Sequence, residues 1–425
     1  MMAALINSIV NMGNLLQQKY HVIIIGAGPA GLMAAITAAS NGHSVLVLEK
    51  NKQAGRKLLM SGNGRCNLTN GEPDQHRFLS SFGKNGKFLY SAWQNFNNLQ
   101  TISFFNDLGL QTTVESDGRI FPAAGNSKTV LNLLLNCLQN YGGQISYQTE
   151  VKKILFNNGR ITKGITNQGE VKGEKWIVAT GGLSYPLTGS TGDGWSWAKE
   201  AGHQITIARP VLVPLKAQEK WIKKVEGISL SGVKIKLKEK NINSSEMIGD
   251  LIFTRQGISG PSVLNFSRFL KDLLPGKVIL TLDFLPKKKK DDLDQLLRQE
   301  IEGHGRKELL SVIAGYAPRR LARHLIESLA INPGMRAGYI TRKQRGELVK
   351  ALKQTELTVV GTGGFKQAMV TAGGIRLAEI NQSAMRSKLI NNLYFAGEVL
   401  DLDGPTGGYN LQVCWTTGYV AGLLL

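Results

Sequence analysis

The chain has 425 residues, of which 42% are hydrophobic and 19% are charged; this composition excludes a disordered protein and suits a globular, multidomain one. Its three cysteines, Cys66, Cys137 and Cys414, are too few and too widely spaced for a disulfide framework or a CxxC metal site, so we expect a reducing, cytoplasmic location. The formal net charge of +20 favours polyanionic partners, nucleic acid above all, although lysines that only keep the surface soluble would give the same total.

We expect no targeting signal in the first residues. Residues 1–20 lack the basic start and cleavage pattern of a signal peptide, and we expect a poorly ordered tail there. The uncharged run 22–42 approaches the length of a membrane span, but its glycines and its proline fit a strand, a turn and a helix better. We therefore expect no membrane partner.

A dinucleotide-binding fingerprint follows the tail. Residues 21–25 form an apolar run that predicts a buried parallel strand, and the sequence GAGPAG then opens an alanine-rich helix that should end near Ser40. Gly26 permits the tight turn, Gly28 lets a pyrophosphate approach the backbone, and Gly31 lets the helix pack closely on the strand. This order of strand, glycine turn and helix predicts a Rossmann-type α/β domain.

A second strand, residues 44–48, ends in Glu49, which lies 23 residues beyond Gly26. A carboxylate at this point accepts hydrogen bonds from the hydroxyls of an adenosine ribose. It also disfavours a 2′-phosphate, so the site suits FAD or NAD better than NADP.

Three later segments favour FAD over NAD. Residues 61–67 form a loop of glycines and short polar side chains that can lie against a cofactor, and Arg65 can offer its fork of donors to a phosphate or a flavin carbonyl. Residues 175–182 read as a strand that ends in Ala-Thr-Gly-Gly, and residues 392–398 as a strand that ends in a carboxylate. Because both patterns occur where two-domain flavoproteins complete the FAD site, we expect the C-terminal segment to close the fold.

Four motifs resemble those of the BaiN-type flavoproteins, also called the aminoacetone oxidase family: LMSGNGRCNLTN at 59–70, GRIFP at 118–122, FTRQGISGP at 253–261, and FAGE with GPTGGYNLQ at 395–412. The resemblance runs from about Tyr20 to the C-terminus. It implies a Rossmann-type FAD-binding domain formed by both chain ends and interrupted by an insertion with a β-barrel-like part and a small helical part.

In residue numbers, the expected FAD-binding segments are 21–205 and 374–425, and the expected insertion is 206–373, with its helical part at about 287–355. The fingerprint and the resemblance together imply cofactor contacts from Gly26, Gly28, Ala30, Gly31, Glu49, Lys50, Arg56, Lys57, Ser61, Gly62, Asn63, Arg65, Cys66, Asn67, Val151, Thr180, Gly181, Gly182, Gly397, Glu398, Gly408, Tyr409, Asn410 and Leu411.

The resemblance leaves the substrate open, because the family label has covered amine oxidation, reduction of oxo bile acids and reduction of a uridine in large-subunit ribosomal RNA to dihydrouridine. The distribution of charge favours RNA: residues 206–373 contain 30 lysines and arginines against 16 acids, or +14 of the total +20. Candidate RNA-binding side chains are the alternating lysines of one strand and the arginines of a predicted helix: Lys234, Lys236, Lys238, Lys240, Arg319, Arg320 and Arg323. A merely solvated face is the alternative reading.

The sequence indicates the reductant and the proton donor less clearly than it indicates the FAD site. The glycines at 361–364 lack the spacing of a second dinucleotide motif, so NADH or NADPH would have to visit the flavin transiently. Cys66 is the first candidate for the general acid, because it lies in the glycine loop expected beside the flavin; a small loop-filling residue is the alternative. Two other functions stay open: an FAD-dependent reductase or oxidase of a small molecule, and a non-catalytic RNA-binding factor that retains FAD.

Overall fold

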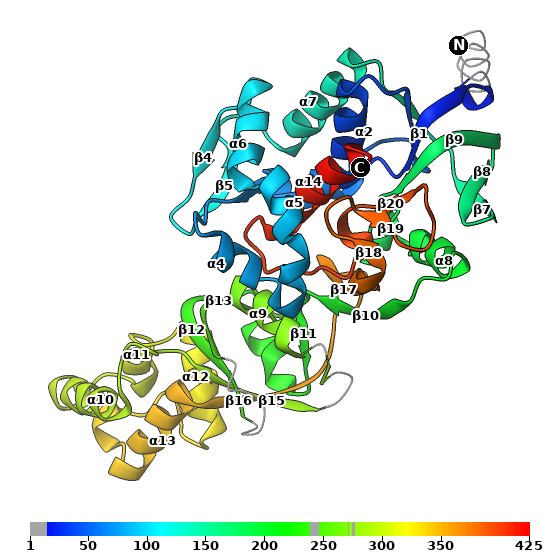
Figure 1. Cartoon of the computed structure of the whole chain (residues 1–425). Coiled ribbons are helices and arrows are strands. Elements are labelled where there is room, and N and C mark those ends of the chain that lie inside the picture. Colours follow the sequence, from blue (N-terminus) through cyan, green and yellow to red (C-terminus); the bar gives the residue numbers. More distant parts are fainter. Residues whose placement is uncertain (1–14, 239–245, 271, 274–276) are drawn as a thin grey trace, which may run out of the picture. The chain divides into compact units, whose positions relative to one another are not determined.

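The computed structural model describes residues 15–238, 246–270, 272–273 and 277–425, so the expected tail up to residue 14 and Lys240 lie outside the described residues. The chain forms two compact units. The first unit joins residues 1–210 to residues 369–425, and the second unit comprises residues 211–368. Figure 1 shows the elements of both units along the chain.

A parallel sheet at the centre of the first unit draws strands from both ends of the chain. Its middle runs in the order β20 (Leu393–Phe395), β9 (Gly169–Val178), β1 (Lys19–Ile25), β2 (Val45–Leu48) and β6 (Gln144–Ser146). All four neighbouring pairs are parallel. The prediction that a Rossmann-type domain is assembled from both chain ends is therefore confirmed.

The other strands of the first unit are short or antiparallel. Strands β7 (Val151–Asn157) and β8 (Arg160–Thr166) join the sheet at β9, and β18 (Ile380–Asn381) and β19 (Arg386–Ser387) continue it beyond β20. A separate small sheet consists of β3 (Thr69–Asn70), β5 (Arg119–Pro122) and β4 (Thr112–Val114). Strands β10 (Ile205–Val211) and β17 (Val370–Ile375) form a further pair. The helices of this unit are α2 (Pro29–Ser40), α3 (Arg56–Met60), α4 (Gln75–Ser80), α5 (Tyr90–Asn95), α6 (Asn98–Asp107), α7 (Ser127–Asn140), α8 (Asp193–Glu200) and α14 (Tyr409–Gly422).

Helices α2 and α14 pack against each other at backbone distance (Figure 1, blue and red). A β-carbon at Gly418 would lie 2.4 Å from the carbonyl oxygen of Ala30, and one at Gly422 would lie 2.6 Å from that of Ala34. Side chains larger than hydrogen do not fit at these two positions. The C-terminal helix is thus held directly on the helix that follows the glycine turn, which brings the last residues of the chain to the first.

The second unit contains a closed six-stranded barrel. Its strands are β11 (Leu215–Ala217), β14 (Gly257–Ser259), β13 (Glu246–Thr254), β12 (Ser229–Leu237), β15 (Val278–Asp283) and β16 (Thr355–Thr362), in that order around the barrel. Along β12, Val233, Ile235 and Leu237 are buried, whereas the residues between them face outward, as the period of two requires. The expected β-barrel-like part is confirmed.

A helical part lies between β15 and β16. It consists of α10 (Lys290–His304), α11 (Leu309–Ile313), α12 (Arg319–Ser328) and α13 (Arg342–Lys353), while α9 (Pro261–Ser267) belongs to the barrel. The four helices share one apolar core with the barrel strands, and a two-point ion pair from Arg345 to Asp294 at 2.8 and 2.9 Å ties α13 to α10. The expected small helical part is confirmed as well.

The fold includes residues that the sequence assigns to the tail. Strand β1 starts at Lys19, two residues before the expected strand, and the side chains of Leu16 and Tyr20 are buried in the core of the first unit. The last residues of the expected tail therefore belong to the fold. Among the described residues, no helix has both the length and the apolar composition to cross a membrane.

The packing of α2 on α14 leads to a prediction about two glycines. Gly418→Ala should destabilise the protein by about 1–3 kcal/mol, because the added methyl group overlaps the carbonyl of Ala30. Gly346→Ala in α13 is the matched control: its methyl group would meet no atom within 4 Å, so this change should stabilise the protein by roughly 0.5–1 kcal/mol through helix propensity. Denaturant titration followed by circular dichroism checks both signs, and equal effects would contradict the close packing.

Candidate active site

The glycine turn after β1 leaves open space in front of the start of α2. Gly26 has a φ of +104°, and a β-carbon at Gly31 would lie 1.9 Å from the carbonyl oxygen of Gly26, so the turn and the helix close on each other. A β-carbon at Gly28 would meet nothing within 4 Å. Because the first N–H groups of a helix have no partner within it, this space suits a pyrophosphate.

Glu49 stands at the end of β2 with 7% of its surface exposed. One carboxylate oxygen accepts a hydrogen bond from the N–H of Ala27 at 2.9 Å, and the other accepts from the backbone N–H and the side-chain amide of Asn51 at 2.8 and 2.7 Å. The backbone N–H of Thr149 donates to the carbonyl of Glu49 at 2.9 Å, which brings the segment leading to Val151 alongside. The carboxylate is therefore fixed in orientation, and the oxygen that accepts only from Ala27 keeps a lone pair for a ribose hydroxyl.

Lys50 and Arg56 are engaged with the protein itself. The Lys50 ammonium lies 2.6 Å from Asp193 at the start of α8 and 2.6 Å from the hydroxyl of Thr191, and Arg56 donates to the side chain of Asn51 at 2.8 Å. The contacts of Lys50 tie the loop after β2 to the loop before α8, whereas that of Arg56 lies within the segment after β2. In this structure both cations therefore bind other side chains of the candidate site.

A charged network joins four segments that are distant in sequence. Lys57 donates to Glu398 and to the hydroxyl of Ser184, both at 2.5 Å, and Ser184 donates to the second oxygen of Glu398 at 2.5 Å. That same oxygen accepts from the backbone N–H of Thr371 at 2.8 Å, while the Thr371 hydroxyl accepts from the N–H of Ser184 at 3.0 Å. The structure thus brings the predicted Lys57 and Glu398 together. Sequence reasoning did not assign Ser184 or Thr371 to the cofactor site, and Thr371 lies in none of the motifs.

The loop that contains Cys66 turns its thiol inward. Gly62, Asn63 and Gly64 adopt positive φ angles of 56°, 56° and 83°, and Cys66 itself has a φ of 64°. Its side chain has no exposed surface, and burial raises the pKa of the Cys66 thiol to about 12, with a hydrogen bond from Ser61 acting in the opposite direction. The thiol is therefore protonated at neutral pH but has no surface at which a substrate would meet it.

Arg65 in the same loop points to the small sheet. Its guanidinium lies 2.8 Å from the carboxylate of Glu115 and 4.0 Å from the centre of the Phe121 ring. The side-chain amide of Asn67, in its hydrogen-bonded orientation, accepts from the N–H of Gly408 at 2.9 Å. The loop is thereby attached to β5 and to the start of α14.

The residues before α14 are also tightly held. Gly408 has a φ of +100°, and a β-carbon there would lie 2.2 Å from the backbone of Thr69, so only glycine fits. The side chain of Asn410 accepts from the N–H of Gly404 at 2.8 Å and donates to its carbonyl at 3.0 Å. The Tyr409 ring packs on Phe78 with their centres 4.6 Å apart. The N-terminus of α14 is therefore a second rigid set of backbone donors in the first unit.

Thr180 supplies an independent indication of a ligand. Its hydroxyl, at the end of β9, is buried and has no hydrogen-bond partner within the described part of the chain. A buried hydroxyl without a partner costs about 1–3 kcal/mol, so such groups are usually satisfied by a ligand or water. The open space at Gly28, the fixed Glu49 and this hydroxyl all follow the carboxyl ends of β1, β2 and β9, where sheets of this type bind dinucleotides. The residues present fit FAD.

The candidate RNA-binding side chains belong to the second unit and differ in their state. Lys234 lies 3.1 Å from Glu246 and Lys238 lies 2.7 Å from Glu356, so both are paired. Arg320 donates to the backbone carbonyl of Glu226 at 3.0 Å, and Arg319 approaches Glu308 at 3.8 Å. Lys236 and Arg323 are exposed. Assignment of this set to RNA stays a prediction.

Comparison with known proteins places these features in a family. Residues 20–424 match the family described as HI0933-like protein Rossmann domain. A 3-dehydro-bile acid delta(4,6)-reductase of Clostridium scindens is 32% identical over 406 residues, which cover 94% of this chain and 97% of the relative. A ribosomal RNA dihydrouridine synthase of Haemophilus influenzae is 33% identical over 406 residues, with the same two shares of coverage.

A solved structure shows the same fold at low sequence identity. The 3-ketosteroid delta1-dehydrogenase of Sterolibacterium denitrificans, solved with 1,4-androstadiene-3,17-dione, superposes with a TM-score of 0.54 at 14% identity and covers 95% of this chain and 99% of its own. The likeness extends over both units of the chain. At this identity it supports the fold alone.

The role of Glu49 leads to a prediction about cofactor retention. Glu49→Arg should weaken FAD binding at least about tenfold, because each hydrogen bond to a charged group that is lost costs roughly 1.5–3 kcal/mol. Glu200→Arg, at the exposed end of α8, makes the same change of charge away from the glycine turn and should retain FAD. The ratio of flavin to protein after gel filtration measures the effect. A protein that releases only FMN on denaturation would contradict the adenosine assignment.

Proposed function

The chain belongs to the HI0933-like family of FAD-dependent oxidoreductases, and we propose that it reduces a uridine of large-subunit ribosomal RNA to dihydrouridine. The two relatives do not choose between substrates, because the proteins named for a bile acid and for ribosomal RNA are equally similar to this chain. We choose ribosomal RNA over a bile acid because of the net positive charge of the second unit.

The observation that carries the proposal is the charge of the second unit. Residues 211–368 contain 29 lysines and arginines against 16 aspartates and glutamates, an excess of 13 positive charges in well under half of the chain. A steroid-sized substrate has no use for such an excess. An RNA backbone does, since each phosphate that is neutralised releases condensed counterions and strengthens binding.

The first unit supplies the means to hold the reacting group. When bound, reduced FAD supplies a hydride to the pyrimidine ring, and a proton completes the addition across the ring double bond. The backbone at Gly28 and the carboxylate of Glu49 would hold the pyrophosphate and the ribose, and the Lys57 and Glu398 pair would meet the remainder of the cofactor. The uridine has to leave its stack for this reaction, and NADH or NADPH has to supply the electrons.

Cys66 remains the proposed proton donor, but its thiol is buried and has to become accessible before it can act. A pKa of about 12 keeps the proton on the thiol at neutral pH, as a general acid requires, but it also makes the thiol a weaker proton donor than one with a pKa near 7. Transfer then requires that the turn over residues 61–65 opens. Asn63 and Cys66 hold left-handed backbone angles without being glycines, which costs free energy and favours such a change.

A second candidate function is reduction of a steroid-like small molecule. It is favoured by the bile acid reductase of Clostridium scindens, which matches nearly the whole chain at 32% identity. The same first unit would serve, and the positive surface of the second unit would then be solvated only. Competition separates the two functions: ribosomal RNA should accelerate reoxidation of the reduced flavin, and an oxo bile acid should not.

The direct test is a map of dihydrouridine in ribosomal RNA. RNA from cells that lack this protein should lose one or a few dihydrouridines, and expression of the wild-type chain should restore them, whereas Glu49→Arg should not. Mass spectrometry of nuclease fragments measures the mass gain of two hydrogens. An unchanged map would remove the RNA-reductase proposal, and restoration by the FAD-deficient variant would reassign the protein as a non-catalytic RNA-binding factor.

The proposed proton donor has its own test. Cys66→Ala should keep FAD and RNA binding and slow dihydrouridine formation by about two to four powers of ten, the usual range for loss of a general acid. Tyr409→Phe is the matched comparison, because it removes the phenolic hydroxyl at the start of α14, which is one of the alternative proton donors, and should leave the rate within a few fold. Single-turnover kinetics with pre-reduced enzyme measure both. A near-normal rate for Cys66→Ala and a slow one for Tyr409→Phe would transfer the role to Tyr409.

A further inference from the structure

One surface of the second unit combines aromatic rings with unpaired cations. The short helix η4 (Lys220–Val225) packs on α12, and its Ile222 and Val225 are buried in the core of the unit. Between the two elements the ring of Trp221 stacks on that of His324, with ring centres 4.3 Å apart and planes inclined by only 15°. We call η4, α12 and this ring pair the seam.

The cations of the seam are exposed, and one exposed carboxylate, that of Glu226, follows η4 directly. Lys220, Lys223 and Arg323 are exposed and make no ion pair within the described parts of the chain. Lys224 approaches Glu327 only to 3.9 Å. Glu219 is turned inward, where it accepts a hydrogen bond from the N–H of Thr358 at 2.8 Å. The seam therefore presents free cations around a pair of rings.

The ring pair is suited to contact with bases. Trp221 is half-buried, whereas the other tryptophans of the chain, all in the first unit, are buried. Burial, and then the charge of Lys224, lower the pKa of His324, so its ring is neutral at pH 7 and stacks without a charge of its own. Flat rings flanked by lysine and arginine are the combination with which proteins hold single-stranded nucleic acid.

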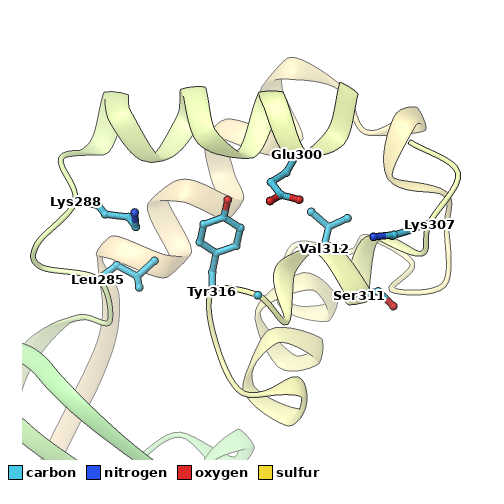
Figure 2. Close-up of a pocket in the computed structure, with 8 residues that line it drawn as sticks. Leu285, Lys288, Glu300, Lys307, Ser311, Val312 and Tyr316 are labelled. Carbon is cyan, nitrogen blue, oxygen red and sulfur yellow. The ribbon is translucent and has the colours of Figure 1, made fainter. Parts of the chain in front are cut away.

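Two other basic regions of the same unit lack this combination. The lysines of β12 face outward, but two of the three described are paired with glutamates at 3.1 and 2.7 Å. A cavity of about 360 Å³ in the helical part is lined by Lys288 and Lys307, and Figure 2 shows the carboxylate of Glu300 and the ring of Tyr316 between them. A carboxylate in that position opposes a phosphate.

We propose that the seam is the main RNA-binding surface of the second unit, with Trp221 contacting an unstacked base and Lys220, Lys223 and Arg323 contacting the flanking phosphates. This inference rests on the proposed function, since it names where the same RNA substrate is held. Compared with the set of RNA-binding residues expected from the sequence, it keeps Arg323 of α12, adds Lys220 and Lys223 of η4, and gives the lysines of β12 a smaller role.

The test compares two triple variants with equal loss of charge. K220Q/K223Q/R323Q removes three seam cations, and K287Q/K288Q/K307Q removes three cations at and beside the cavity of Figure 2. The probe is a uridine-rich single-stranded RNA of about 20 nucleotides, long enough to exceed the usual site sizes of such surfaces. Fluorescence anisotropy over a series of salt concentrations gives the affinity and its salt dependence.

The seam variant should bind roughly a hundredfold more weakly at 0.1 M salt, and the slope of log affinity against log salt should fall by about two units for three lost contacts on a single strand. The cavity variant should match the wild-type chain. Flavin content and thermal unfolding should be unchanged in both, because all six side chains are at or near the surface. Wild-type affinity in the seam variant, or an equal loss in the cavity variant, would overturn the inference.

Tryptophan fluorescence provides a second measurement that does not depend on substituted charges. RNA should quench the emission of the wild-type chain, and the quenching should disappear in Trp221→Phe while the other tryptophans remain. Quenching that persists in this variant would remove Trp221 from the surface. If the wild-type chain binds no RNA and forms no dihydrouridine, the proposed function itself fails; if it does both while the seam variant binds normally, only the seam fails.

Discussion

The contact between α2 and α14 is the constraint on which the rest of the first unit depends. Gly418 and Gly422 lie against the carbonyls of Ala30 and Ala34 at distances that admit no side chain, so the two helices cannot separate by even one methyl group without losing the interface. One of these helices begins at the glycine turn and the other begins at Gly408. Their contact therefore positions two rigid sets of helix N-terminal donors in one unit, although they come from opposite ends of the chain. An insertion of 158 residues between the ends is tolerated because neither helix relies on it for this packing.

Local patterns predicted the parts of the site that are made by local structure. The turn at Gly26, the end of α2 at Ser40 and the carboxylate at the end of β2 follow from the spacing of the glycines, the apolar runs and the acid in the dinucleotide-binding fingerprint. The patterns at 175–182 and 392–398 predicted that the C-terminal segment closes the fold, but not that β20 pairs with β9, since no local signal says which strand lies next to which. The contacts of Thr371 and Ser184 with Glu398 were not predicted either. They depend on where three distant segments meet, and hydroxyl groups carry no distinctive pattern in a sequence.

The lysines of β12 show a similar limit. Alternation along a strand correctly predicted that Lys234, Lys236 and Lys238 share the outer face, because side chains of a strand alternate with a period of two. It did not reveal that Glu246 on β13 and Glu356 on β16 would neutralise two of them. Net charge counted along the chain therefore overstates the charge available to a partner at this strand. Sequence analysis overlooked the short helix η4, because the stacking of its Trp221 on His324 of α12 appears only in the tertiary packing.

The position of Cys66 sets the remaining problem of the chemistry. A general acid has to keep its proton in the resting state and release it at the reacting atom, and burial serves the first need while opposing the second. Two features of the loop affect how far the thiol could move. Residues 62–64 all have positive φ angles, and the next residue, Arg65, is attached to Glu115 and Phe121. If the glycine-rich turn moves while Arg65 stays attached, the thiol is exposed beside a fixed point. Under the proposed function, the thiol would then meet a substrate base only in the opened state of the loop.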